Sequence, residues 1–358
     1  MASRVAGDEF VIVMNGLEDP TEAMKTAWRI VETFHAPFFT SGMESFVTAS
    51  VGVAIATPMQ GVTSDVLLLQ ANTAMYAAKA QGRDIAVQYT SDLHSIVSAR
   101  LKIENDLFNA LASNQLEVWY QPDVDLETGE VICVEALLRW HHPDGSVWTA
   151  ERFIDVAENT GLILSIGNWV LLEVCRQAAA WAVARPERPM HVRVNVSADQ
   201  LADRGFLNAI DAALNSSGVD PGLLGVEITE TVLLRETMTV NANIGRLRER
   251  RIGIALDDFG TGFASLMYLR RFEIDLLKID RSFIRNLENS DTDRQITDSV
   301  ISLAATLGMK VTAEGVETAN QASLLRQMGC PSAQGWFFSA ALPPAEVALL
   351  FDHIFETS

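Results

Sequence analysis

The chain has 358 residues, 48% of them apolar, which is enough for one large domain with its own core and part of a second. Its formal net charge is −19 and no basic patch stands out, which argues against binding a long nucleic-acid backbone but not against a small anionic ligand held through metal ions. No uninterrupted apolar run reaches about 18 residues and the start lacks a signal-peptide pattern, so we expect no membrane span in this chain.

The three cysteines, Cys133, Cys175 and Cys330, are scattered and show no zinc-type pairing. We therefore expect reduced thiols, in or near the core of a cytoplasmic protein.

Residues 1 to about 90 differ in pattern from the rest. A polar turn at residues 4–10 leads into an apolar run at 11–14, which predicts a β-hairpin. The spacing of apolar residues then predicts a helix, a long strand and a second helix, in this order: 21–35, 46–56 and 64–81.

Three motifs in this region resemble the C-terminal half of a GGDEF domain, the diguanylate cyclase module: Arg4-Val-Ala-Gly-Asp-Glu-Phe10, Ala49-Ser-Val-Gly-Val-Ala54 and Ala74-Met-Tyr-Ala-Ala-Lys-Ala-Gln-Gly-Arg83. Ala6 stands where the first glycine of the signature belongs, and the half of the family that supplies an early metal-binding aspartate and the guanine-binding residues is missing. Four residues of the family's site can be carried over: Asp8, Glu9, Lys79 and Arg83.

Half a site cannot hold two metal ions and a nucleotide. We therefore expect residues 1–90 to be a partial, inactive GGDEF domain, either a vestigial remnant or the product of a shortened start. Its missing strands would leave an open sheet edge, so this segment should be the least stable part of the molecule.

The remaining chain alternates strand-like and helical segments. Residues 91–112 carry apolar residues on one helical face and form either a connector helix or the first helix of the next domain. Further helices are expected over 151–159 and 165–184. Eight segments have strand character: 116–121, ended by Pro122, then 131–138, 191–196, 224–228, 252–256, 275–279, 310–313 and 333–337. Eight strands over about 240 residues predict a (β/α)8 TIM-like barrel, because a doubly wound sheet would need a topological switch point that is not evident.

Polar residues follow the apolar runs of these strands. The run at 252–256 stops on Asp257 and Asp258, whose buried charges are costly unless a cation neutralises them. Other runs end on six further polar residues: Glu135, Asn195, Glu227, Lys278, Glu314 and Gln334. Strand ends meet at one face of a barrel, so these side chains should converge. Their oxygen ligands suit Mg²⁺ or Mn²⁺ better than Zn²⁺.

Each of these residues also has a structural interpretation. Asp258 could be a helix N-cap, Asn195 an Asx turn, and Lys278 a solvated charge at a strand end. Coincidence across all the strand ends favours a site. Two ions about 3.5–4 Å apart could clamp the attacking and leaving oxygens of a phosphate ester, with Lys278 near the developing charge.

Residues 95–355 resemble an EAL domain, the phosphodiesterase that opens cyclic di-GMP. The name-giving motif is intact as Glu135-Ala-Leu137. The other matching stretches, in chain order, are Tyr120-Gln-Pro122, Asn195-Val-Ser197, Val226-Glu-Ile-Thr-Glu230, Asp257-Asp-Phe-Gly-Thr-Gly262, Leu277-Lys-Ile-Asp280, Ala313-Glu-Gly-Val-Glu317 and Gln334-Gly335. The resemblance implies an α/β chain with a partial GGDEF domain over 1–90, a connector helix over 91–112 and a phosphodiesterase barrel over 113–358.

The resemblance also implies roles for individual residues. The first metal ion would be held by Glu135, Asn195, Glu227 and Asp257, and the second by Asp257, Asp258 and Glu314. A water bridging the ions would be the nucleophile that opens cyclic di-GMP to linear pGpG. Lys278 would orient it, while Glu314 is the alternative general base, and Glu230 would pin the loop from Phe259 to Leu266. The substrate side of the site would comprise Gln121, Leu138, Arg139, Ser197, Asp258, Gln334 and Glu317.

Departures from the family are few. Phe263 and Ala264 stand where the family usually has Tyr and Ser. No predicted metal ligand is missing, which favours an active enzyme over two alternatives. These are a weak or inactive EAL domain that serves as a cyclic-di-GMP receptor or partner-docking module, and a barrel enzyme for a different phosphodiester. The family also leads us to expect a homodimer, formed through the loop after Asp258 and the neighbouring helix.

Overall fold

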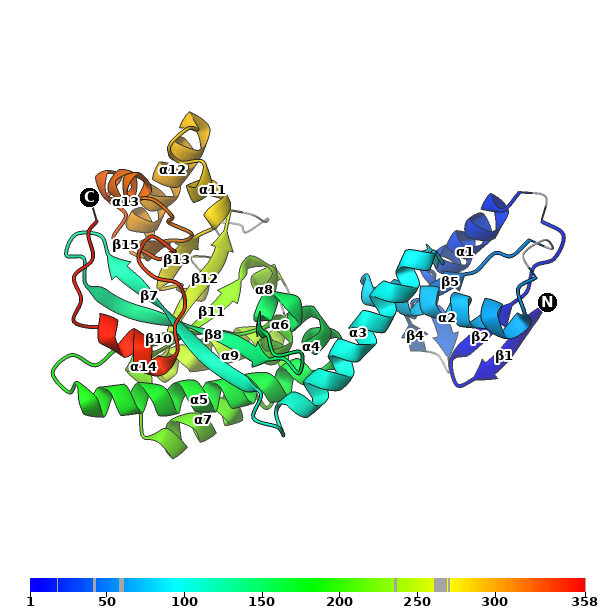
Figure 1. The fold of residues 1–358 in the computed structure, drawn as a ribbon, viewed down its shortest axis with the longest axis horizontal. Coiled ribbons are helices and arrows are strands. Elements are labelled where there is room, and N and C mark those ends of the chain that lie inside the picture. The colour runs from blue at the N-terminus through cyan, green and yellow to red at the C-terminus, as the bar shows by residue number, and fades with distance from the viewer. Residues whose placement is uncertain are drawn as a thin grey trace. The chain divides into compact units, whose positions relative to one another are not determined.

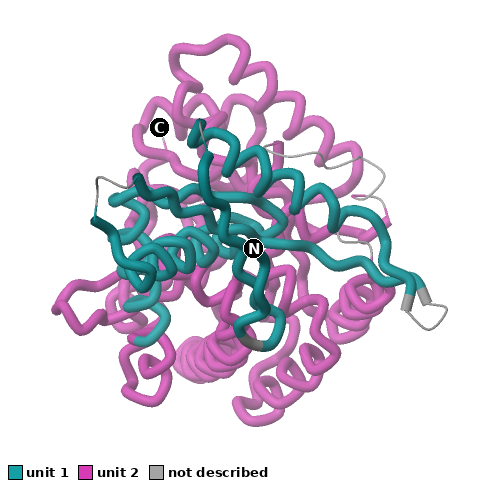
Figure 2. The backbone as a smooth tube through the Cα atoms, turned by 90° about the vertical axis from the view of Figure 1, so that its right-hand side faces the viewer, with its two compact units in different colours: residues 1–105 teal, residues 106–358 magenta. Residues whose placement is uncertain are grey.

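The computed structural model describes residues 1–17, 19–40, 43–57, 61–234, 237–260, 269 and 271–357. The chain divides into two compact units, residues 1–105 and 106–358, here called the N-terminal unit and the barrel unit (Figure 2).

The N-terminal unit begins with an antiparallel hairpin, β1 (Ala2–Ala6) and β2 (Glu9–Ile12), which confirms the predicted hairpin. Its remaining elements are α1 (Thr21–Phe34), β3 (Phe38–Thr40), β4 (Met43–Ser45), β5 (Val51–Val53), α2 (Ser64–Ala80), β6 (Ala86–Gln88) and the start of α3 (Ser91–Ala110). Both helices between residues 21 and 81 lie where apolar spacing predicts them.

The long strand expected over residues 46–56 is wrong, because only β5 forms there and it pairs in parallel with β6. Close approach to α2 fixes this segment: a Cβ on Gly52 would lie 2.1 Å from the carbonyl oxygen of Ala71 and 2.2 Å from the nitrogen of Met75. Phe46 and Val47 are exposed and have no ladder partner among the described residues. Backbone contact with a helix, rather than a long ladder, therefore positions β5.

The described part of the N-terminal unit buries little apolar surface. Its strands form three separate two-stranded pairings. A core cluster comprises Ala27, Val31 and Ala86, with a few half-buried neighbours, while Phe39 and Phe46 are each 74% exposed. The residues carried over from the GGDEF signature, such as Asp8 and Arg83, are also on the surface. A small core of short side chains gives limited hydrophobic stabilisation.

The barrel unit contains a closed ring of eight strands with helices around it (Figure 1). The strands are β7 (Leu116–Asp125), β8 (Val131–His141), β10 (His191–Asn195), β11 (Leu224–Thr229), β12 (Gly253–Phe259), β13 (Leu276–Ile279), β14 (Lys310–Ala313) and β15 (Ser332–Ala333), with β9 (Val147–Thr149) added to β8 outside the ring. The predicted TIM-like barrel is confirmed. It departs from an all-parallel ring because β7 runs antiparallel to both β8 and β15.

Pro122 does not end its strand, contrary to the sequence prediction, since β7 continues to Asp125. Tyr120 exchanges backbone hydrogen bonds with Leu342, on the side of β7 away from β8. The nitrogen of Pro122, two residues on, faces that same side, so the ladder to β8 does not need its missing N–H.

The helices of the barrel unit lie outside the strands. They are α4 (Ile154–Thr160), α5 (Leu162–Ala184), α6 (Ala198–Ala202), α7 (Phe206–Ser217), α8 (Glu230–Leu234), α9 (Met238–Glu249), α11 (Arg281–Arg285), α12 (Asp291–Leu307), α13 (Ala319–Gln327) and α14 (Pro344–Val347). Among the described residues, α5 alone is long and apolar enough to cross a membrane by length and composition. It packs against α7 and the strands, and its Trp181 ring meets the Tyr120 ring edge-on at 4.8 Å. All three cysteines are buried and free, as expected for core thiols.

We predict that the N-terminal unit opens more readily than the barrel. Amide hydrogen exchange resolved by residue should show β5 and β6 exchanging at least about tenfold faster than β11 to β14, a difference of about 1.4 kcal/mol in opening free energy. Equal protection in the two units would contradict this expectation.

Candidate active site

The polar residues predicted at strand ends point into the barrel, but several lie within their strands. Glu135 is in the middle of β8, Glu227 is the fourth residue of β11, and β12 continues past Asp257 and Asp258 to Phe259. Glu314 and Gln334 alone follow their strands directly. The ladders extend beyond the apolar runs because neighbouring strands still pair there, as Thr229 does with Asp257.

Lys278 of β13 lies at the centre of this cluster and is fully buried. Its ammonium Nζ lies 2.6 Å from Oε2 of Glu227, 3.0 Å from Oε2 of Glu135, 3.2 Å from Oδ1 of Asp257 and 2.5 Å from Oε1 of Glu314. One cation thus joins carboxylates from four other strands or strand ends. The interpretation of Lys278 as a solvated charge is wrong.

Two amide side chains hold the carboxylates from the sides. Asn195 donates from Nδ2 to Oε1 of Glu135 at 2.7 Å. The Asx-turn alternative for this residue is wrong, because the N–H of Ser197 that such a turn would use donates to Oε1 of Gln200 instead. Gln334 donates from Nε2 to Oε2 of Glu135 at 2.7 Å and to Oε1 of Glu314 at 3.0 Å. Because one amide nitrogen serves both acids, Gln334 fixes the spacing between Glu135 and Glu314.

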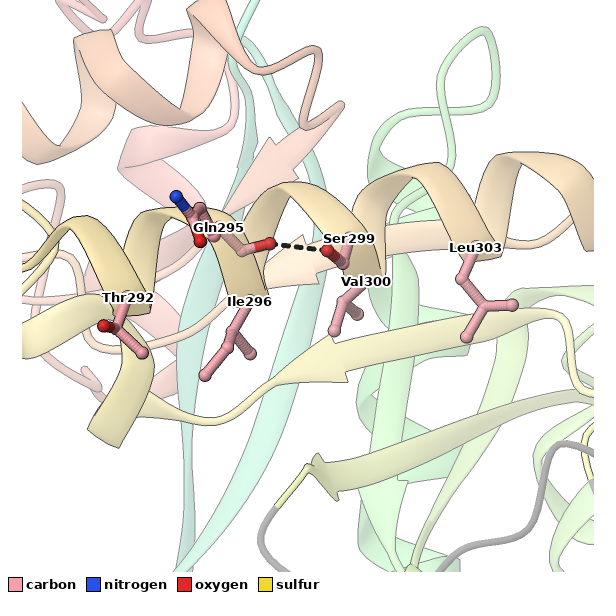
Figure 3. Close-up of a pocket in the computed structure, with 6 residues that line it drawn as sticks. All are labelled: Thr292, Gln295, Ile296, Ser299, Val300 and Leu303. Carbon is pink, nitrogen blue, oxygen red and sulfur yellow. Dashed lines mark hydrogen bonds between the residues drawn. The ribbon is translucent and has the colours of Figure 1, made fainter.

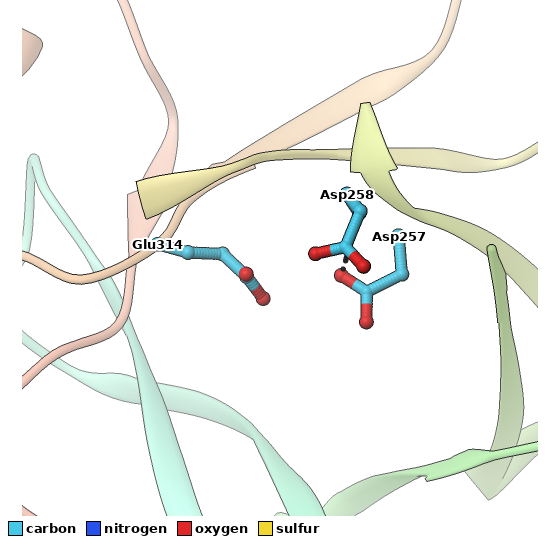
Figure 4. A group of neighbouring side chains, drawn as sticks. All are labelled: Asp257, Asp258 and Glu314. Carbon is cyan, nitrogen blue, oxygen red and sulfur yellow. Dashed lines mark hydrogen bonds between the residues drawn. The ribbon is translucent and has the colours of Figure 1, made fainter. Parts of the chain in front are cut away.

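Asp257, Asp258 and Glu314 form the part of the cluster with the geometry of a cation site. One ligand oxygen from each lies within 4.8 Å of the others (Figure 4). The backbone of Asp258 has a φ of +55°, a conformation that aspartate adopts more easily than most residues, and its N–H donates to Oδ1 of Asp257 at 3.0 Å. Asp258 therefore belongs to β12 and is not a helix N-cap.

Burial and mutual repulsion set the proton affinities of the cluster. Burial alone would raise the pKa of Glu135, but the Lys278 ammonium and the hydrogen bonds from Gln334 and Asn195 lower it to about 2. Burial and the charge of Glu135 raise the pKa of Glu227 to about 8, and burial raises the pKa of Glu314 well above its usual range despite Lys278. Burial would lower the pKa of Lys278, but the carboxylates around it raise it well above its usual range. Lys278 therefore stays charged and Glu135 ionised, while Glu227 and Glu314 hold their protons more tightly because too little positive charge faces them.

Glu230 lies at the start of α8 and contacts the loop after β12. Its Oε1 accepts a hydrogen bond from the backbone N–H of Gly260 at 2.8 Å. Gly260 has a φ of +101°, and a Cβ there would lie 2.8 Å from the ring of Phe283, so only glycine fits. The predicted contact of Glu230 with this loop is therefore present at its first residues. Phe263, Ala264 and the dimer contact expected from this loop lie outside the described residues.

Three of the predicted substrate residues, Gln121, Leu138 and Arg139, lie on the β7–β8 hairpin. Glu135, Leu137 and Arg139 alternate on the inner face, opposite Gln121 and its neighbours, and Gln121 donates from Nε2 to the carbonyl oxygen of Ser339 at 3.0 Å. Leu138 lies on the outer face and is buried, so it does not face the candidate site as expected, and the half-buried Leu137 has the inner position beside it. One residue along a strand reverses the direction of the side chain.

Three predicted substrate residues, Arg139, Ser197 and Glu317, make local contacts in this structure: ring stacking, helix capping and a backbone hydrogen bond. The Arg139 guanidinium stacks 5.5 Å from the centre of the Trp119 ring. The Ser197 hydroxyl caps α6 by accepting a hydrogen bond from the N–H of Gln200 at 3.2 Å. Glu317 is exposed, and its N–H donates to Gln321.

The sequence prediction missed two buried residues beneath the cluster, Arg193 and Asp123. Arg193 donates to Oε1 of Glu227 and to Oδ2 of Asp123. Their positions could have been found by alternation, because Arg193 precedes Asn195 by two residues and Asp123 follows Gln121 by two.

Two shallow hollows occur elsewhere on the barrel unit. One follows a single face of α12 and is lined by Thr292, Gln295, Ile296, Ser299, Val300 and Leu303 (Figure 3). The other lies between α9 and residues 271–273. Neither is lined by a predicted site residue, so the acid cluster remains the candidate site.

Comparison with known proteins places this site in a family. The model of the EAL domain matches residues 104–341, and that of the diguanylate cyclase GGDEF domain matches residues 1–85. The bifunctional diguanylate cyclase/cyclic di-GMP phosphodiesterase MucR of Pseudomonas aeruginosa is 37% identical over 345 residues, which cover 96% of this chain and 50% of MucR. The cyclic di-GMP phosphodiesterase NbdA of the same organism is 37% identical over 96% of this chain and 44% of NbdA. The chain thus spans about half the length of the curated relatives it matches.

Solved structures agree with the family match. The structure described as PaMucR phosphodiesterase in complex with c-di-GMP is 39% identical, with a TM-score of 0.66 over 69% of this chain and 99% of that one. The EAL enzyme Bd1971, with cAMP and cyclic di-GMP bound, is 26% identical, with a TM-score of 0.69 over 82% of this chain and 77% of that one. This chain belongs to the EAL domain family and carries a partial GGDEF domain at its N-terminus.

Proposed function

We propose that the chain is a divalent-metal-dependent phosphodiesterase that hydrolyses cyclic di-GMP to linear pGpG. The observation that carries this proposal is the convergence of Asp257, Asp258 and Glu314 beside Glu135 and Glu227. MucR and NbdA, the relatives described above, are named as cyclic di-GMP phosphodiesterases, and two similar structures contain that nucleotide. Because the chain spans half of those proteins, the activity is inferred for this chain from its own site.

The charge of the site suits two divalent cations. Within the cluster and directly beneath it lie six carboxylates: Asp123, Glu135, Glu227, Asp257, Asp258 and Glu314. They face two cations, Lys278 and Arg193, which leaves a formal surplus of four negative charges. Two divalent ions would neutralise that surplus, and an all-oxygen donor set is the one that Mg²⁺ or Mn²⁺ prefers.

In this proposal the residues divide between two metal positions. Glu135, Asn195, Glu227 and Asp257 would hold the first ion, and Asp257, Asp258 and Glu314 the second. When bound, the ions would activate water and neutralise charge on the phosphate ester.

The chain's own residues would position the reaction. Gln334 holds Glu135 and Glu314 at a fixed separation, and Lys278 keeps the acids together through its buried ammonium. On the inner wall of the β7–β8 hairpin, the half-buried Arg139 is suited to a phosphate oxygen of the nucleotide. Two residues lie where they could act on the attacking water: Lys278, whose ammonium would orient it, and Glu314, which would serve as the alternative general base.

A timed assay of nucleotide products tests the function. Purified protein with Mn²⁺ or Mg²⁺ should convert cyclic di-GMP to pGpG, and a chelator should stop turnover. Asp257→Asn should lower the rate by more than about 100-fold, because loss of groups that merely support a ligand already costs 10–100-fold. Asp211→Asn, a matched change on α7 outside the barrel, should keep the wild-type rate. Tight nucleotide binding without product, beside an active EAL control enzyme, would instead favour a receptor.

We predict that Glu230 acts on the rate through its contact with the loop. Glu230→Ala should lower turnover by about 10–100-fold, because the N–H of Gly260 loses its acceptor. Glu230→Gln keeps an acceptor oxygen and should retain most of the activity. If Glu230→Ala matches the wild type in rate and Mn²⁺ affinity, the loop contact has no functional role.

Removal of the central ammonium should destabilise the barrel when no metal ion is present. In chelator, Lys278→Met should lower the free energy of unfolding by about 3–5 kcal/mol, because it leaves buried carboxylates unpaired. Urea unfolding followed by tryptophan fluorescence measures this change, since six of the seven tryptophans belong to the barrel unit. Lys310→Met, an exposed lysine on β14, is the control. Equal stability of the two variants would contradict the central role of Lys278.

A further inference from the structure

A second polar layer lies beneath the carboxylate cluster. Arg193 on β10 is almost completely buried and lies between two acids. Its Nε donates to Oε1 of Glu227 at 2.7 Å, and its Nη2 donates to Oδ2 of Asp123 at 2.8 Å. Asp123 on β7 is fully buried and the Arg193 side chain is 11% exposed, so the pair is largely shielded from solvent.

Hydrogen bonds anchor this layer to the opposite side of the barrel. Thr312 on β14 donates from Oγ1 to Oδ2 of Asp123 at 3.0 Å, and its hydroxyl lies 2.8 Å from that of Ser332 on β15. A connected path therefore runs from Ser332 through Thr312, Asp123 and Arg193 to Glu227. It joins five strands of the ring and runs from the layer beneath the cluster up to Glu227.

Arg193 determines which oxygen of Glu227 faces the site. Oε1 is bound by Arg193 and Oε2 by Lys278, so the carboxylate cannot turn without breaking a charge-assisted hydrogen bond. With Oε1 held from beneath, Oε2 is the oxygen that remains directed toward Glu135 and the centre of the cluster.

We propose that Asp123 and Arg193 are a positioning pair that orients Glu227 for metal binding and limits it to ligation through Oε2. The inference rests on the proposed function only in taking Glu227 as a metal ligand. A purely stabilising role is a weak explanation for the pair, because a buried ion pair commonly contributes less to stability than apolar residues of the same volume.

The test uses a substitution that leaves the charge of the site unchanged. The double variant Asp123→Asn with Arg193→Met removes one negative and one positive charge, so a change in metal affinity reports orientation rather than net charge. Mn²⁺ binding to the full chain, measured by calorimetry, should weaken about 10–100-fold, the usual cost of losing a group that orients a ligand. Raising the Mn²⁺ concentration should restore turnover of cyclic di-GMP toward the wild-type maximum.

Arg193→Lys is the second variant, and it tests the proposal even if the double variant does not fold. It keeps the buried charge but has no planar fork to bind Glu227 and Asp123 together. We expect its Mn²⁺ dissociation constant to lie between those of the wild type and the double variant.

The matched control is Asp211→Asn with Arg250→Met. This pair joins α7 and α9 through two bonds of 2.7 Å, outside the barrel interior. It should leave Mn²⁺ affinity unchanged. Wild-type affinity, within twofold, in Arg193→Lys or in a folded double variant would overturn the inference. If the wild type fails to cleave cyclic di-GMP but Mn²⁺ affinity falls as described, the proposed function fails and the positioning role stands.

Discussion

The buried ammonium of Lys278 is the interaction on which the barrel's interior depends. Four carboxylates that are far apart in the sequence lie within 3.2 Å of its Nζ, and each comes from a different strand or strand end. Burying any of these acids alone would be very costly, so the strands that carry them must close around one cation. The closed ring and the polar cluster therefore depend on each other. The ring excludes solvent from its interior, and the charge of Lys278 offsets the free-energy cost of burying the carboxylates there.

Strand β7 runs antiparallel to both of its neighbours, and the β7–β8 hairpin places side chains both beneath the carboxylate cluster and above it. Its inward-facing residues alternate, so Gln121 lies opposite Glu135 while Asp123, two residues on, reaches the layer beneath and meets Arg193. In the other direction the β7–β8 hairpin extends past the acids and presents Arg139 beside Trp119. One antiparallel strand thus contributes to the floor, the acid layer and the wall of the candidate site.

Sequence periodicity and motifs predict the barrel and its acid set well, because strand number and polar interruptions of apolar runs are local features. They do not reveal which side of a strand faces each neighbour, which explains the wrong end assigned at Pro122, whose nitrogen faces away from β8. The family resemblance assigned Leu138 to the substrate side, but alternation along β8 turns Leu137, not Leu138, to the inner face. Alternation from Asn195 and Gln121 would have placed Arg193 and Asp123 on the inner face, but that they pair with each other follows only from the distant strands meeting in the fold. Residues 46–56 form strand only at β5, where β6 pairs with it, because Phe46 and Val47 have no ladder partner among the described residues.

The hydrogen bonds of the cluster imply that its ligands are oriented before any cation arrives. Glu135 is held by Asn195, Gln334 and Lys278, and Glu227 by Arg193 and Lys278. A divalent ion would therefore exchange partners within an ordered site instead of folding it, in contrast to small domains whose metal supplies the folding free energy. This arrangement also lowers the affinity for metal, because the ion must compete with Lys278 for the same carboxylate oxygens. Affinity for metal should then depend on how far Lys278 can withdraw while Asn195, Gln334 and Arg193 keep the carboxylates in place.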